Sequence, residues 1–141
     1  TSSLKYLVNG MNGTLEEVDK KKVIVAVPFY TRLWQIDASS EWNYDGTETS
    51  GTIVSSTACS MEKAQEIIKE YNLNVSWNEN TEQEFAEGTV GGYIYQIWLE
   101  TAASLEIKLD EIIQADIGGV AAWELGFEQS EVWNLFKKFN S

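Results

Sequence analysis

The chain has 141 residues, of which 43% are hydrophobic and only one is proline, so it can form a packed core and does not have the composition of a disordered protein. Its net charge of −12 argues against nucleic acids and anionic membranes as partners, whereas a neutral polymer such as a polysaccharide is compatible. The absence of histidine excludes Ser-His and Cys-His nucleophile pairs and His-based metal sites, and we expect no metal and no other cofactor. No apolar stretch approaches the roughly 18 residues of a membrane span, and the single Cys59 has no internal disulfide partner.

The N-terminal part of the chain predicts a helix followed by a buried strand. Apolar residues recur at helical spacing between residues 4 and 15. The segment from Val23 to Trp34 is a nearly continuous apolar run, typical of a parallel strand buried on both faces, and we expect the strand itself over 23–30. The run ends in aromatic and Arg side chains, as a barrel strand does where it meets a ligand face.

The middle of the chain predicts a separate α+β unit. Residues 35–57 are rich in Ser, Thr, Gly and Asp and predict a loop. Ser60 then caps a helix that ends near Asn72. Three short β-like runs at 74–79, 84–87 and 93–99 indicate a small antiparallel hairpin unit, so residues 35–98 are interpreted as an insertion.

The C-terminal part returns to the first pattern, with a helix around residues 105–113, an apolar strand from Gly118 and a last helix that starts at Ser130. The predicted fold class is therefore α/β: a C-terminal fragment of a TIM (β/α)8 barrel, with barrel segments at 1–34 and 99–141, that carries the α+β insertion. A closed barrel needs roughly 250 residues, so we expect this chain to be a piece of a larger protein. Its open barrel edges predict pairing with a missing N-terminal half or with another copy of the chain.

The ordered segments resemble the C-terminal part of family 18 glycoside hydrolases, closest to their bacterial chitinase-like and spore-cortex-lytic branch. The segments that carry the resemblance are KVIVAVPFYTRLW, IWLE, SLEIKLDEI and IGGVAAWELGFE, and together they cover essentially the whole chain. The family's seventh strand ends in a Tyr-Gly-Arg turn, for which this chain has Tyr30, Thr31 and Arg32. Thr31 departs from the usual Gly.

The resemblance implies a parent protein that acts on β-1,4-linked N-acetylhexosamine polymers, chitin or peptidoglycan, outside the cell, at the cell wall or on spores. The family's catalytic run Asp-x-x-Asp-x-Asp-x-Glu has no match in this sequence. We therefore expect no catalytic residue in this chain and no hydrolysis by it alone. Its partner would be an oligosaccharide or polysaccharide that contains N-acetylglucosamine.

By the same resemblance, Trp123 corresponds to the family's Trp beneath the reacting sugar, and Tyr30 and Arg32 would offer hydrogen bonds to it. The candidate substrate-binding residues are Tyr30, Arg32, Trp34, Trp98, Glu100, Trp123 and Glu124. Each also has a purely structural interpretation: core packing for the aromatic residues, a salt bridge at a strand end for Arg32, and surface carboxylates for the two glutamates. Trp42 and Tyr44 could extend the groove, whereas Trp77 is expected in the core of the insertion.

Three hypotheses follow for the function. The chain is the groove-lining part of a hydrolase, the corresponding part of a lectin-like relative that binds glycans without cleaving them, or a purely structural fragment. Glycan titration separates the third from the first two.

Overall fold

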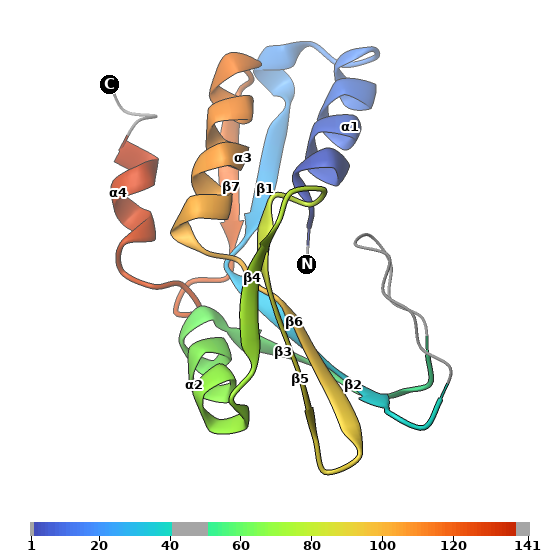
Figure 1. Cartoon of the computed structure of the whole chain (residues 1–141). Coiled ribbons are helices and arrows are strands. Elements are labelled where there is room, and N and C mark those ends of the chain that lie inside the picture. The colour runs from blue at the N-terminus through green and yellow to red at the C-terminus, as the bar shows by residue number, and fades with distance from the viewer. Residues whose placement is uncertain (1, 41–50, 138–141) are drawn as a thin grey trace.

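The chain folds into a mixed α/β structure with two separate sheets (Figure 1). The computed structural model describes residues 2–40 and 51–137. In chain order, the elements are α1 (Leu4–Leu15), the 3-10 turn η1 (Lys20–Lys22), β1 (Ile24–Pro28), β2 (Tyr30–Asp37), β3 (Ile53–Ser60), α2 (Met61–Tyr71), β4 (Asn74–Asn78), β5 (Gln83–Val90), β6 (Tyr93–Trp98), α3 (Ala102–Gln114), β7 (Gly119–Trp123) and α4 (Val132–Phe136).

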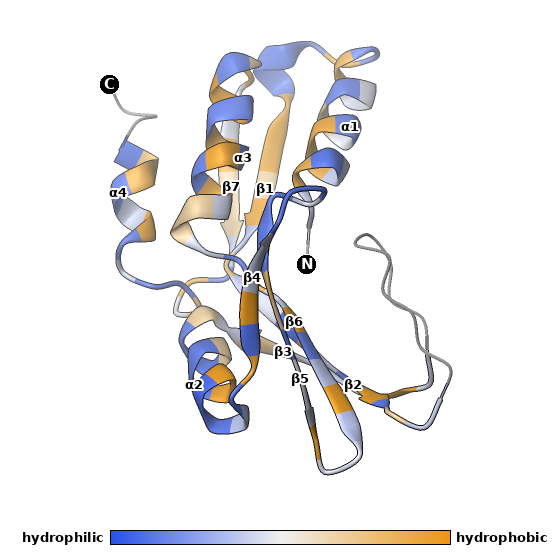
Figure 2. Cartoon of the chain, viewed as in Figure 1, coloured by the Kyte–Doolittle hydropathy of each residue, from blue (hydrophilic) through white to orange (hydrophobic). Residues whose placement is uncertain are grey.

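The first sheet consists of β1 and β7, which run parallel and pair in register from Ile24 opposite Gly119 to Pro28 opposite Trp123. Apolar side chains of α1, α3 and α4 pack with those of β1 into one core. Figure 2 shows apolar and polar residues mixed along α1 and α3 and an apolar stretch in β1. Its buried members are Leu7, Met11, Val27, Phe29, Met61, Leu105, Leu109, Ile112 and Val132. Within the described residues the parallel sheet has two strands and does not close into a barrel.

A close backbone approach fixes the start of β7. The amide of Gly118 donates to the carbonyl oxygen of Lys20 over 2.8 Å. A Cβ at this position would lie 2.3 Å from the carbonyl oxygen of Lys21, so a residue with a side chain could not sit there without displacing backbone. On the same side, the exposed carboxylate of Asp116 forms ion pairs with the amino groups of Lys20 and Lys21, at 2.8 and 2.6 Å.

The second sheet is antiparallel, with strand order β3-β2-β6-β5-β4, and helix α2 packs against one of its faces. Ser60 caps α2, as expected, by accepting a hydrogen bond from the amide of Lys63. The helix ends at Asn72, which adopts a left-handed conformation with φ of 51°. The helix and the sheet share a second core, and its buried residues are Cys59, Ala64, Ile67, Leu73, Ala86, Ile97 and Leu99.

The apolar run from Val23 to Trp34 forms two strands in two sheets. The parallel ladder ends where the amide of Phe29 donates to the carbonyl oxygen of Trp123, over 2.6 Å. From Tyr30 onward the chain pairs with β3 and β6 instead. Pro28, which has no amide hydrogen to donate, lies just before this change of sheet.

Two further expectations were wrong. Residues 35–57 were predicted as a loop, but β2 continues to Asp37 and β3 begins at Ile53. The polar residues of β3 suit an edge strand with exposed side chains, which gives no apolar alternation to detect. Trp77 was expected in the core, but 37% of it is exposed on the edge strand β4.

Candidate functional site

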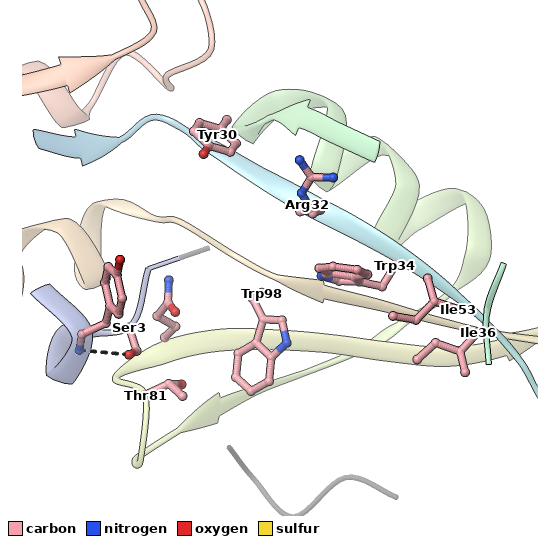
Figure 3. A pocket seen from close by; sticks show the side chains of 10 residues that line it. Ser3, Tyr30, Arg32, Trp34, Ile36, Ile53, Thr81 and Trp98 are labelled. Carbon is pink, nitrogen blue, oxygen red and sulfur yellow. Dashed lines mark hydrogen bonds between the residues drawn. The ribbon is translucent and has the colours of Figure 1, made fainter. Parts of the chain in front are cut away.

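A cleft of about 550 Å³ lies between the N-terminus of α1 and the face of the antiparallel sheet opposite α2 (Figure 3). Strands β2 and β6 supply most of its aromatic side chains. The residues that line it are Ser3, Tyr6, Tyr30, Arg32, Trp34, Ile36, Ile53, Thr81, Gln83 and Trp98.

The alternation of β2 decides which of its residues reach the cleft. Successive side chains of a strand point to opposite faces. The even-numbered residues 30, 32, 34 and 36 therefore line the cleft, whereas Leu33 packs against the core beneath α2. Arg32 lies directly opposite Trp98 in the ladder with β6, so the two strands present their side chains to the same space.

The aromatic rings and the guanidinium of the cleft are held by neighbours. The rings of Trp98 and Phe85 lie 4.5 Å apart between centroids. The guanidinium carbon of Arg32 lies 5.8 Å from the centre of the Trp34 ring, and its Nη1 donates to Ser56 Oγ over 2.8 Å. Such contacts limit the rotamers of both side chains and present a flat surface beside hydrogen-bond donors.

The cleft differs in charge from the chain as a whole. Of its described lining residues, Arg32 alone carries a full charge, and none is acidic. The chain nevertheless contains 22 acidic residues. The cleft is therefore suited to an uncharged, hydroxyl-rich ligand that can stack on indole rings.

Trp123 and Glu124 lie beside the cleft and do not line it. Trp123 ends β7 opposite Pro28, two residues before Tyr30, and 66% of it is exposed. Glu124 is half-buried and follows Trp123 through a cis peptide bond. Both therefore stand at the carboxyl ends of the parallel strands, the end at which barrel proteins bind their ligands.

Glu100 is sealed beneath the cleft. Its side chain and that of Lys108 are fully buried, and Lys108 Nζ lies 2.8 and 2.6 Å from the two carboxylate oxygens. Ser104 Oγ donates to Oε1 over 2.6 Å, and Gln83 Nε2 approaches Oε2 at 3.4 Å. Burial raises the pKa of the Glu100 carboxyl, while Lys108 and Ser104 act in the opposite direction. The carboxylate is thus enclosed by protein groups and is not open to a ligand in the cleft.

Thr31, which stands where the resembling family has Gly, belongs to the ordinary extended backbone of β2. Its side chain is fully buried, and its hydroxyl donates to the carbonyl oxygen of Trp98. This bond ties β2 to the end of β6 at the cleft.

Sequence reasoning missed six of the lining residues, which are Ser3, Tyr6, Ile36, Ile53, Thr81 and Gln83. Ser3 caps α1 by accepting from the amide of Tyr6, and the amide of Leu4 donates to Thr81 over 3.3 Å. The first contact is a local helix cap, but the second joins residues far apart in the chain, so no local sequence pattern predicts that the start of α1 lies beside Thr81. Trp42 and Tyr44, the suggested groove residues of the 35–57 segment, lie outside the described residues.

Comparison with known proteins identifies the family. The model of the glycosyl hydrolases family 18 matches residues 2–128. This chain belongs to that family. No curated protein matches the chain.

Solved structures of a spore cortex-lytic enzyme, a chitinase and a pseudo-chitinase share its fold. The spore cortex-lytic enzyme SleL of Bacillus megaterium superposes with a TM-score of 0.75 at 20% identity, over 96% of this chain and 29% of that one. A chitinase of Chromobacterium violaceum gives 0.76 at 18% identity, over 99% and 39%. Human YKL-39, described as a pseudo-chitinase with retained chitooligosaccharide binding, gives 0.68 at 15% identity, over 98% and 40%. The family 18 chain thus spans well under half the length of each of these structures.

No helix in the described part of the chain is long and apolar enough to cross a membrane. No group of three or more His, Cys, Asp or Glu residues in residues 2–40 and 51–137 is arranged to hold a metal ion.

Proposed function

We propose that this chain lines the sugar groove of a family 18 protein that acts on or binds β-1,4-linked N-acetylhexosamine polymers, chitin or peptidoglycan. The observation that carries the proposal is the cleft with Trp34 and Trp98 on one sheet face, next to Tyr30 and Arg32. The apolar faces of pyranose rings stack on indoles, while hydroxyl and acetamido groups need donors and acceptors at the rim. Trp123 and Glu124 would extend the groove along the ends of the parallel strands.

Calorimetric titration of the chain with a tetrasaccharide of β-1,4-linked N-acetylglucosamine tests this proposal. The wild-type chain is expected to bind, and Trp34→Ala should weaken binding about fivefold or more, because stacking on the ring contributes on the order of 1 kcal/mol. Trp77→Ala is the matched control, since Trp77 is half-exposed on β4 and does not line the cleft. Absence of binding, or equal binding by the two variants, would overturn the proposal.

The groove-lining role holds for a hydrolase and for a lectin-like relative. In the hydrolase the general acid would come from the part of the protein that carries the family's acidic motif, which this sequence does not contain. YKL-39 is described as a pseudo-chitinase that retains chitooligosaccharide binding, so it is a precedent for the alternative in which the protein binds glycans without cleaving them. We expect no shortened products when the tetrasaccharide is incubated with this chain and analysed by mass spectrometry. The appearance of shortened products would contradict the proposal that the general acid lies in another part of the protein.

A structural fragment that pairs with another copy is the third candidate. Ile24, Trp123 and Leu125 are each at least 66% exposed around the two-stranded sheet. Such apolar surface favours association with missing barrel strands or with a second chain. A chain that dimerises and does not bind glycan would favour this candidate.

Together with the glycan-binding role, we propose a location outside the cell, at the wall or on spores.

A further inference from the structure

Gln83, at the start of β5, lies between the cleft and the buried ion pair. It lines the cleft, yet only 1% of its surface is exposed. Its Nε2 lies 3.4 Å from both Glu100 Oε2 and the carbonyl oxygen of Leu99. The amide is therefore anchored at one end by the sealed cluster of Glu100, Ser104 and Lys108.

The chemistry of these partners fixes the orientation of the amide. A carbonyl oxygen only accepts hydrogen bonds, and so does a carboxylate held by the Lys108 ammonium at both of its oxygens. The NH2 group of Gln83 must therefore face Glu100 and Leu99. Its carbonyl oxygen Oε1 must therefore point the other way.

The acceptor end of the amide lies on the side of the cleft. Both hydrogen bonds of the Gln83 side chain to described residues use Nε2. Gln83 is one of the residues that line the cleft, so Oε1, the end turned away from the buried cluster, is the end nearer to a ligand in it.

We propose that Gln83 is a sugar-binding residue whose Oε1 accepts a hydrogen bond from a hydroxyl or acetamido N–H of the glycan, and that Glu100 is the positioning residue that prevents the amide from flipping. This inference rests on the proposed glycan-binding function. It gives Glu100 a role in the site without contact to the sugar. A free amide could turn either its donor or its acceptor to the ligand, whereas an anchored one accepts only.

The test compares Gln83→Met with Gln35→Met in calorimetric titrations with the N-acetylglucosamine tetrasaccharide. Gln35 lies on β2 with its side chain bonded to Ser55 and does not line the cleft, so it controls for the same chemical change in the same sheet. Gln83→Met should weaken binding about fivefold to tenfold, as expected for one lost hydrogen bond to a ligand. Gln35→Met should bind as the wild type does. A cellotetraose titration separates the two donors, because only an acetamido contact would be lost with that sugar.

The outcomes are distinguishable. If wild type and Gln35→Met bind and Gln83→Met binds equally well, the Gln83 inference fails while the proposed function stands. If the wild type does not bind, the proposed function fails and the inference falls with it. Gln83→Leu is a second variant for the case that methionine disturbs the fold. If both variants unfold, the Gln83 amide serves the fold rather than the ligand, and the inference fails.

The anchoring is tested by removing both charges together, in Glu100→Gln/Lys108→Met. A glutamine at position 100 can donate as well as accept, so it no longer dictates the orientation of the Gln83 amide. We expect tetrasaccharide binding to weaken about threefold, with Gln83 itself unchanged. If this folded variant binds the tetrasaccharide with wild-type affinity, Glu100 does not position the Gln83 amide.

Discussion

The cleft and the buried cluster below it lie next to each other at the end of β6, yet their polar groups are in opposite environments. Trp98 and Arg32 face an open space, whereas Glu100, two residues after Trp98, is fully enclosed with Lys108. In the enclosed region every charge must be paired, because desolvation of a lone ion costs several kcal/mol. In the open region a donor or a ring can be left for a ligand. A carboxylate at a strand end can therefore bind a ligand only if its surroundings leave it accessible.

The largest effect is expected from breaking the enclosed region with Lys108→Met. This change leaves the Glu100 carboxylate buried without its cation and should lower the free energy of unfolding by about 3–5 kcal/mol. Urea denaturation measures it. Lys63→Met is the control, because Lys63 and Glu66 form an ion pair whose side chains are 56% and 60% exposed, and its effect on the free energy of unfolding should be much smaller. Equal losses in both variants would show that burial does not distinguish the two pairs.

A smaller effect is expected at the boundary of the two regions, from Thr31→Val. The substitution keeps the shape of the buried side chain but removes the hydroxyl that donates to the carbonyl oxygen of Trp98. The free energy of unfolding should fall by about 1 kcal/mol. Thr57→Val, at an exposed position of β3, should change it by less. An unchanged denaturation midpoint for Thr31→Val would show that this bond does not hold the strands together.

The smallest effect is expected at the surface, where an exposed carboxylate forms ion pairs with two lysines. Hydrogen bonds from Lys20 and Lys21 lower the pKa of Asp116 from 3.8 to about 2, whereas burial raises that of Glu100. A lowered carboxyl pKa stabilises the fold above the unfolded value, and that contribution is lost as the pH falls through about 2. Titration by carbon NMR should show this pKa, and Lys21→Met should move it upward. A pKa near 3.8 in the wild type would contradict the ion pairs.

Much of the fold could be predicted from periodicity. The helices near residues 4–15, 60–72 and 105–113 are confirmed by α1, α2 and α3, and the hairpin strands by β4 to β6. The change of sheet at Phe29 could not be predicted, because an apolar run has the same appearance in either sheet. The edge strand β3 carries too few apolar residues to be recognised.

The site was predictable only in part, for a related reason. Tyr30, Arg32, Trp34 and Trp98 follow from strand ends, and the structure brings all four to one cleft. The burial of Glu100 depends on Lys108 from the next helix and on Gln83 from another strand, and no sequence pattern reveals that enclosure. Tyr6 joins the cleft because the start of α1 docks on the turn at Thr81.

The measurement that tests the central claim most directly is a titration with the N-acetylglucosamine tetrasaccharide followed through the indole N–H resonances of the tryptophans. The signals of Trp34 and Trp98 should shift together as the cleft fills, while those of Trp77 and Trp133 stay in place. Shifts at Trp77 or Trp133 with Trp34 and Trp98 unmoved, or no shift at all, would contradict the assignment of this cleft as the sugar-binding surface.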